Sequence, residues 1–225
     1  MKLKYERYYL KEITNESYKE LIEYSRWMNK KLGNYPMIIG GWAVYFYCKG
    51  VGSRDIDTVF PNRDMKHYVL KHYFESHNYK EEGIFVKEFF KEINVRNKIL
   101  RVYLDACSVE DRNYLRIDPN IEIPWNLCFR YNTLKEIADD THVYLPDPEI
   151  LFLYKSASFI DREHKLKIAD SSARAYISHK VWKDAYDLET LISGGLDKSI
   201  VSKLARKLGF EKYLKTIEKK LGIYL

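Results

Sequence analysis

Residues 38 to 59 constrain the fold more than any other part of this 225-residue chain. They read IIGGWAVYFYCKGVGSRDIDTV: an apolar run, a pair of glycines, a second apolar run, a glycine-rich turn, and two aspartates separated by one isoleucine. This order predicts a strand, a tight turn into a helix, a second turn and a second strand. Alternate side chains of a strand share a face, so we expect Asp55 and Asp57 to point the same way while Ile56 points into the core.

The two aspartates predict a metal site. Two like charges that lie close together repel each other and resist ionising together, and a divalent cation between them removes that cost. Oxygen ligands at this spacing suit Mg²⁺, which binds through one or two carboxylates together with substrate phosphates. A lone Asp-x-Asp is more often a solvated turn or a helix cap, so the aspartates need the surrounding pattern to carry a functional prediction.

That pattern resembles the signature of the nucleotidyltransferase superfamily with the polymerase-β-like fold. The signature is an apolar residue, Gly-Gly or Gly-Ser, a gap of about a dozen residues, and then Asp-apolar-Asp or Asp-apolar-Glu. Here the glycines are Gly40 and Gly41, and the gap of residues 42 to 54 is at the long end of the family's range. The glycine pair fits a turn with no room for a side chain, and it equally fits bare backbone that lets a triphosphate approach the start of a helix.

The resemblance implies a third carboxylate on a neighbouring strand. Residues 99 to 105 read ILRVYLD, an apolar and strand-like run with Asp105 at its end. Facing side chains of paired strands lie within roughly 5 Å of each other, close enough for three carboxylates to share a metal site. We therefore expect Asp55, Asp57 and Asp105 to bind Mg²⁺ or Mn²⁺ and to be the catalytic residues.

Residues 155 to 188 resemble one branch of that superfamily, the AbiEii-like proteins of abortive-infection and toxin–antitoxin systems. That branch carries a lysine, an arginine shortly after, then Lys/Arg-Asp followed by Asp-Leu. The matching residues here are Lys155, Arg162, Lys183-Asp184 and Asp187-Leu188. The resemblance implies that the basic residues hold a triphosphate, whose several negative charges need more compensation than one metal supplies.

Two points stay open at this stage. Lys155 or Arg162 could equally form an interhelical salt bridge with Asp184 or Asp187, and a motif match alone does not separate that interpretation from phosphate binding. The branch also often has an arginine four residues before the first aspartate, where this chain has Val51. Ser53 and Arg54 lie closer to Asp55 and are the residues we expect to contact phosphate there.

Composition and charge bound the remaining possibilities. A hydrophobic content of 46% is enough for one large domain or two small ones. Three scattered cysteines, Cys48, Cys107 and Cys128, form neither a disulfide framework nor a metal-type pair. The first residues, MKLKYERYYLKEIT, lack the apolar core of a signal peptide, and no run reaches transmembrane length. We therefore expect a cytoplasmic protein without a membrane partner.

The net charge of +6 is concentrated at the C-terminal end of the sequence. From Asp197 to Leu225 there are eight Lys or Arg and three Asp or Glu. Such a segment could contact nucleic acid, although most charge runs are solvated helix faces.

The periodicity predicts an α+β fold with two parts. Residues 1–120 are expected to form a nucleotidyltransferase-type mixed sheet with flanking helices, and residues 121–225 a mostly helical domain. Helices are expected over 16–32, 63–77 and 172–192, from the Asp147-Pro148-Glu149 start, and in the pair 198–208 and 211–221. Strands are expected at 36–39 and between Tyr79 and Asp105, with turns near Gly83 and Asn97.

We therefore expect a metal-dependent nucleotidyltransferase that binds ATP or another nucleoside triphosphate. The nucleotide-binding residues would be Gly40, Gly41, Ser53, Arg54, Lys155, Arg162 and Lys183. By the resemblance, the acceptor hydroxyl could belong to RNA such as a tRNA end, to a protein or to a small molecule, and an antitoxin protein could restrain the enzyme. The alternatives are a non-catalytic nucleotide- or partner-binding module, and a structural fold with a fortuitous Asp-x-Asp.

Overall fold

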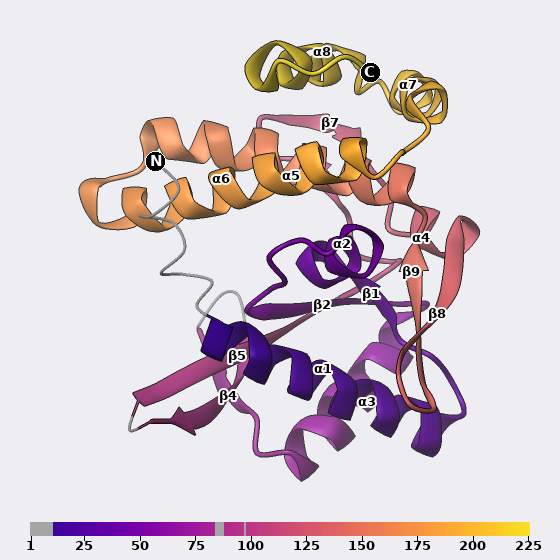
Figure 1. Cartoon of the computed structure of the whole chain (residues 1–225), viewed down its shortest axis with the longest axis vertical. Coiled ribbons are helices and arrows are strands. Elements are labelled where there is room, and N and C mark those ends of the chain that lie inside the picture. Colours follow the sequence, from indigo (N-terminus) through magenta and orange to yellow (C-terminus); the bar gives the residue numbers. More distant parts are fainter. Residues whose placement is uncertain (1–10, 84–87, 97) are drawn as a thin grey trace.

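The computed structural model describes residues 11–83, 88–96 and 98–225. In these residues a seven-stranded mixed sheet is packed between helices on both faces (Figure 1). The strand order is β3-β4-β5-β2-β1-β9-β8, with β2 parallel to β5, β1 antiparallel to β2, and β1 parallel to β9. The strands of this sheet are β1 Met37–Ile39, β2 Asp55–Phe60, β3 Lys80–Glu82, β4 Glu88–Val95, β5 Lys98–Ser108, β8 Asn132–Ala138 and β9 Thr141–Pro146.

A small hairpin of β6 (Tyr114–Leu115) and β7 (Asp118–Glu122) lies outside the main sheet. The helices are α1 Lys11–Leu32, α2 Gly40–Cys48, α3 Arg63–Ser76, α4 Leu127–Arg130, α5 Pro148–Ile168, α6 Ser171–Ser193, α7 Lys198–Lys207 and α8 Glu211–Leu221. The long helices α5 and α6 lie beyond α2, and α7 and α8 lie on the far side of α5 and α6 from the sheet (Figure 1).

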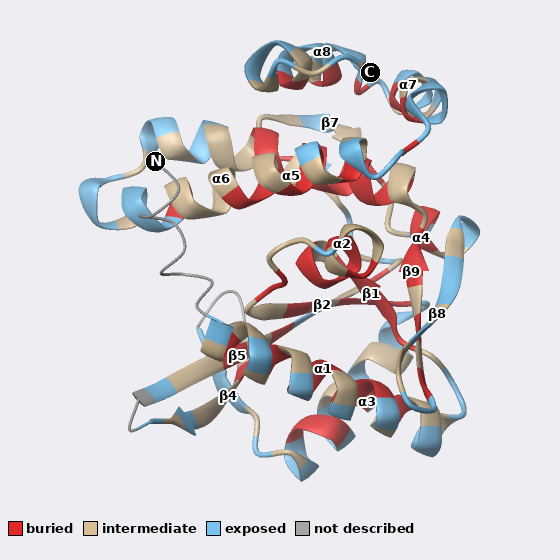
Figure 2. Ribbon diagram, viewed as in Figure 1, coloured by how far each residue is buried: buried red, intermediate tan, exposed pale blue. Residues whose placement is uncertain are grey.

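The two faces of β2 have different environments because side chains alternate along a strand. Ile56 is fully buried, and the hydroxyl of Thr58 lies 3.4 Å from the hydroxyl of Tyr24 on α1. The even-numbered residues of β2 therefore pack toward α1 and α3. On that side of the sheet, buried residues of the strands meet buried residues of the helices (Figure 2). Asp55 and Asp57 point to the opposite face of the sheet, the face on whose side α5 and α6 lie (Figure 1).

The sequence-based assignment of elements is confirmed for most of the chain. All the expected helices form, with α1 beginning at Lys11, earlier than expected, and ending before Gly33. The strand expected at 99–105 continues to Ser108, so Asp105 lies within β5 and not at its end. The turn expected at Asn97 falls outside the described residues.

One expected cap does not form. Asp147 precedes α5, but its side chain makes no hydrogen bond to the first turn of the helix. Its carboxylate accepts a hydrogen bond from the Thr133 hydroxyl instead, at 3.2 Å. The adjacent strand β8 therefore competes with the helix for this side chain.

The chain does not divide between sheet and helices at residue 120. Strands β8 and β9 follow that position and extend the main sheet, because β9 pairs with β1. The strands end at Pro146 and the helical part begins at Pro148. A boundary after residue 120 would therefore separate two strands from the sheet to which they are hydrogen-bonded. Among the described residues, no helix has the length and apolar character needed to cross a membrane.

Candidate functional site

Parallel pairing of β2 with β5 brings the three predicted carboxylates to one face of the sheet. Asp57 is the direct partner of Asp105, and Asp55 is the partner of Tyr103. Directly paired residues of neighbouring strands point to the same face, and neighbouring strands lie about 4.8 Å apart. The prediction that Asp105 lies on a strand beside Asp55 and Asp57 is confirmed.

The glycine pair forms the turn from β1 into α2 directly beside Asp57. Gly40 has a φ of 68°, and a Cβ at this position would lie 1.9 Å from Oδ2 of Asp57. A Cβ on Gly41 would lie 3.0 Å from the Cβ of Ser53. Ile39 gives α2 no side-chain cap, and the N–H groups in the first turn of any helix have no partner within that helix. The close approach explains why glycines are needed here, and it leaves a cradle of bare backbone next to Asp57.

Gly40→Ala should therefore lower the free energy of unfolding by more than backbone strain alone. An alanine held at positive φ costs about 1 kcal/mol or slightly more. At Gly40 the new methyl group must also displace the Asp57 carboxylate. Gly33→Ala is the matched control, because Gly33 has a φ of 59° and open space around the position of a Cβ. Equal losses for the two variants in urea unfolding would contradict the close contact.

The electrostatics around Asp57 and Asp105 disfavour the ionised form of both carboxyl groups. Burial and the neighbouring Asp55 raise the pKa of Asp57, against the opposing effect of Lys155, Lys180 and Arg162. Asp105 keeps an exposed face, but loss of water around it and repulsion by Asp57 and Asp55 raise its pKa from 3.8 to about 7. A cation bound between Asp57 and Asp105 would remove this repulsion.

The raised pKa of Asp105 predicts how stability depends on pH without metal. The folded state holds the proton more tightly than the unfolded state, so this contribution is fully present below about pH 4 and is lost as pH rises through about 7. In EDTA, Asp105→Asn should therefore raise the melting temperature more at pH 8 than at pH 5.

Asp111 provides a control of opposite sign. Hydrogen bonds from Lys66 and from the Ser108 backbone outweigh the effect of burial and lower its pKa to about 2. Its contribution is present above about pH 4 and is lost only as pH falls through 2. Asp111→Asn should lower the melting temperature equally at pH 5 and pH 8. A pH-independent effect of Asp105→Asn would show that Asp105 titrates normally.

Asp55 has a different partner from the other two carboxylates. The ammonium of Lys180 on α6 lies 2.5 Å from its Oδ2. Burial alone would raise the pKa of Asp55, but Lys180, Arg54 and Arg162 outweigh it and lower that pKa. Ser53 is buried, and its hydroxyl accepts a hydrogen bond of 3.3 Å from the backbone N–H of Asp55. The turn and α6 therefore fix Asp55 as an ionised carboxylate.

A buried ion network joins α5 to α6. The ammonium of Lys155 lies 2.7 Å from Asp187 and 3.4 Å from Asp184, and both aspartates are fully buried. Arg162 pairs with Asp184, and Lys183 pairs with Asp187. The salt-bridge interpretation is thus confirmed for Lys155 and Arg162. Burial disfavours charge on Lys155, but Asp187 and Asp184 outweigh that effect and raise its pKa.

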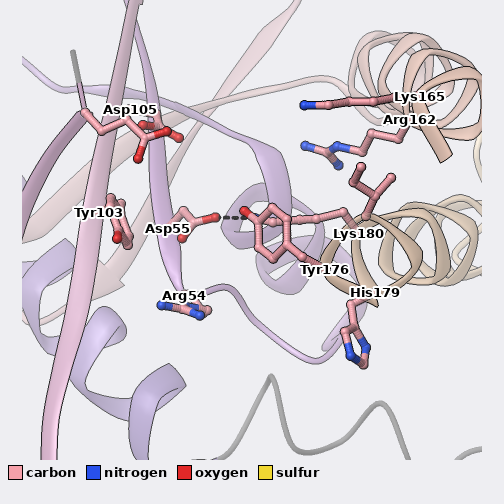
Figure 3. A pocket seen from close by; sticks show the side chains of 11 residues that line it. Arg54, Asp55, Tyr103, Asp105, Arg162, Lys165, Tyr176, His179 and Lys180 are labelled. Carbon is pink, nitrogen blue, oxygen red and sulfur yellow. Dashed lines mark hydrogen bonds and ion pairs between the residues drawn. The ribbon is translucent and has the colours of Figure 1, made fainter. Parts of the chain in front are cut away.

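Three cavities meet the carboxylates: one of about 660 Å³ between α3 and β3 reaches Asp105, and Arg162 lines the other two. The smaller of those two, of about 150 Å³, lies against Gly40, Asp57 and Lys155. The larger, of about 560 Å³, lies between the sheet and α5–α6 (Figure 3). The residues that line it are Arg54, Asp55, Glu88, Tyr103, Asp105, Arg162, Lys165, Tyr176, Ile177, His179 and Lys180. The structure thus brings Asp55, Asp57, Asp105, Gly40, Arg54, Lys155 and Arg162 to these cavities. Lys183 is instead buried against Asp187.

Sequence reasoning missed Lys180, Lys165 and Tyr176. Tyr176, Lys180, Lys183-Asp184 and Asp187 recur at helical spacing along α6, so their positions predict one shared face. Continuing the predicted Lys183-Asp184-Asp187 face one turn toward the N-terminus would have found Lys180. Lys165 lies three residues after Arg162, and nothing in the sequence distinguishes it from the other lysines of α5.

The residues fit a divalent cation in part. Asp57 and Asp105 offer two oxygen ligands in register, with bare backbone beside one of them. With Asp55 held by Lys180, however, no group of three His, Cys, Asp or Glu side chains in the described ranges is arranged to hold a metal. A third carboxylate ligand would have to come from Asp55, whose Oδ2 is already paired with Lys180.

Comparison with known proteins adds no assignment. Neither the models of known protein families nor the sequences of curated proteins gave a match to this chain.

Proposed function

We propose that this protein is a nucleotidyltransferase that moves a nucleoside monophosphate from a nucleoside triphosphate to an acceptor hydroxyl. One observation carries the proposal. Asp57 on β2 and Asp105 on β5 are in register, Asp55 shares their face, and the Gly40 turn leaves no room for a side chain beside Asp57. Acidic side chains that repel one another are costly, and a metal–phosphate ligand offsets that cost.

Asp55, Asp57 and Asp105 would hold Mg²⁺ or Mn²⁺, which on binding neutralises phosphate charge and polarises the reacting oxygens. The acceptor oxygen forms a bond to the α-phosphorus while the bond between that phosphorus and the bridging oxygen breaks. Pyrophosphate leaves with the electron pair, and Asp105 orients the hydroxyl or accepts its proton. Lys155 and Arg162 line the cavity beside Asp57. With Lys183 they face two carboxylates, Asp184 and Asp187, so the network keeps a net positive charge that would offset the charge of the leaving phosphates.

Metal-dependent nucleotide binding tests this proposal. Calorimetry with ATP, GTP, CTP and UTP should show binding of at least one nucleotide in Mg²⁺ or Mn²⁺, and EDTA should abolish it because the carboxylates alone repel the phosphates. Tight binding that ignores metal removal would contradict the site, and so would no binding of any nucleotide. Mass spectrometry of RNA and protein after incubation with each labelled nucleotide would identify the acceptor.

One observation favours the second candidate, a non-catalytic nucleotide- or partner-binding module. The Lys180–Asp55 pair and the Lys155 network already satisfy several charges of the site without a ligand. A protein that binds nucleotide but transfers it to no RNA, protein or small molecule would support this candidate. The nucleotidyltransferase proposal includes a partner protein that restrains the enzyme, as in a toxin–antitoxin pair. Co-purification would identify such a partner.

A further inference from the structure

Lys180 places a positive charge directly on the carboxylate cluster. Its ammonium on α6 lies 2.5 Å from Oδ2 of Asp55 on β2, and Figure 3 shows this contact between the helix and the strand. The buried ion network of α5 and α6 uses Asp184 and Asp187 instead. Among the ion pairs of the described residues, the pair with Lys180 is therefore the one that engages a candidate metal ligand.

The charge of Lys180 also acts on the other two carboxylates. Burial and repulsion by neighbouring carboxylates raise the pKa of Asp57 and of Asp105, and Lys180 opposes that rise at both. The ammonium thus supplies part of the counter-charge that a metal ion would give the cluster.

A metal ion that binds Asp55 is repelled by Lys180. The second oxygen of Asp55 can still reach an ion, but Mg–oxygen bonds are only about 2 Å long, so that ion would lie within about 7 Å of the ammonium. Two cations at this separation repel each other, and salt screens a partly buried pair much less than an exposed one. A divalent ion by itself should therefore bind the three carboxylates weakly while Lys180 is present.

A triphosphate would reverse the effect of Lys180. The ammonium has three N–H donors on a flexible stem, so a group that donates to Asp55 can also donate to a phosphate oxygen. Lys180 lines the cavity of about 560 Å³, and its side chain is 19% exposed, so a ligand in that cavity can reach it. Phosphate oxygens attract the metal ion and the ammonium alike, and Mg²⁺ binds readily through carboxylates together with phosphates.

We propose that Lys180 makes metal binding at Asp55, Asp57 and Asp105 conditional on a phosphate ligand. This inference rests on the proposed function, since it needs those carboxylates to hold the metal. The ammonium disfavours the ion alone and contacts the phosphate when ion and phosphate enter together. Lys180 thereby selects the metal–nucleotide complex over the free metal ion.

Calorimetry with Mn²⁺ alone, and with the Mn²⁺ complex of inorganic triphosphate, tests the proposal. Lys180→Gln keeps a hydrogen-bond donor beside Asp55 and removes the charge. Because the repulsion is gone, it should bind Mn²⁺ alone at least about ten-fold more tightly than the wild type. It should bind Mn–triphosphate about ten- to a hundred-fold more weakly, as for a lost charge-assisted contact.

Two variants are the controls. Lys180→Arg keeps the charge and should bind Mn²⁺ alone as weakly as the wild type. Lys165 is exposed and lines the same cavity, so Lys165→Gln removes a charge there without touching a carboxylate pair. It should change the affinity for Mn²⁺ by no more than about two-fold, because exposed charges are screened.

Thermal melting gives the same answer if Lys180→Gln is less stable than the wild type. A ligand that binds the folded state raises the melting temperature according to its affinity. Mn²⁺ alone should therefore raise the melting temperature of Lys180→Gln more than that of the wild type or of Lys180→Arg.

Equal affinities of the wild type and Lys180→Gln for Mn²⁺ would overturn the proposal. Weaker binding of both Mn²⁺ and Mn–triphosphate by Lys180→Gln would also overturn it, because Lys180 would then only support Asp55. In either case, metal-dependent nucleotide binding by the wild type would leave the transferase proposal standing. Absence of Mn²⁺ and Mn–triphosphate binding in the wild type and the variants alike would reject both.

Discussion

Asp57→Asn should abolish nucleotide transfer while the protein stays folded. The change is nearly isosteric, but it removes the charge at the carboxylate that lies between Asp55 and Asp105 and beside the glycine turn. Loss of a group that stabilises the transition state in this way should lower the transfer rate by about 10³-fold or more. The measurement is incorporation of labelled nucleotide into the acceptor that mass spectrometry identifies.

Stability provides the internal control for that variant. In EDTA, Asp57→Asn should keep or raise the melting temperature, because the raised pKa of Asp57 shows that its charge is disfavoured in the folded protein. Asp139→Asn, at an exposed turn before β9, should leave both transfer and stability unchanged. Full activity in a clean Asp57→Asn preparation would reject the proposed role of this residue.

Asp187→Asn should give the largest loss of stability. The side chain is fully buried, lies 2.7 Å from the Lys155 ammonium and also pairs with Lys183. The variant keeps the shape and removes the charge, so two buried ammonium groups lose a carboxylate partner. Breaking a buried ion pair in this way costs about 3–5 kcal/mol, and urea unfolding would measure it.

The control for that variant lies on the same helix. Glu189 is exposed, and Glu189→Gln should change the free energy of unfolding by no more than about 0.5 kcal/mol. If Asp187→Asn lowered the free energy of unfolding by less than about 1 kcal/mol, Asp184 and water would be sufficient partners for the two ammonium groups. Lys155 would then be available to bind phosphate, and its principal role would be in the site.

The ion network and the Asp55 pair show where sequence reasoning reached its limit. Lys155 and Arg162 are two helical turns apart, so their shared face could be read from the spacing. Whether that face meets Asp184 and Asp187 or a triphosphate depends on how α5 and α6 pack, and spacing carries no information about packing. The same limit applied to Lys180, because its partner Asp55 is 125 residues away in the chain.

The boundary expected after residue 120 does not coincide with the end of the sheet, and the reason is related. Between the end of β5 and the start of α5 lie four strands, β6 to β9, and the four-residue helix α4, none of which has a strong sequence period. The edge strand β8 and its neighbour β9 join the main sheet through pairing with β1, more than a hundred residues earlier. Long-range strand pairing is a property of the whole sheet, and local propensity does not encode it.

The sequence by itself determined the local geometry of the candidate site. The alternation in Asp55-Ile56-Asp57 places two carboxylates on one face, because the side-chain period of a strand is two. The glycine pair sets a turn that has no room for a side chain, and the apolar run before Asp105 makes a strand. Each of these features depends on residues within a few positions of one another, where steric rules act directly on the backbone.

Only the tertiary structure decided which groups meet. Parallel pairing of β2 with β5 placed Asp57 opposite Asp105, and the packing of α6 placed Lys180 against Asp55. The packing of α5 and α6 also buried Lys155 and Lys183, and it placed Arg162 and Lys165 at the cavity of about 560 Å³. Charges on distant segments interact only after the fold has excluded water between them, so their partners follow from packing and not from order in the chain.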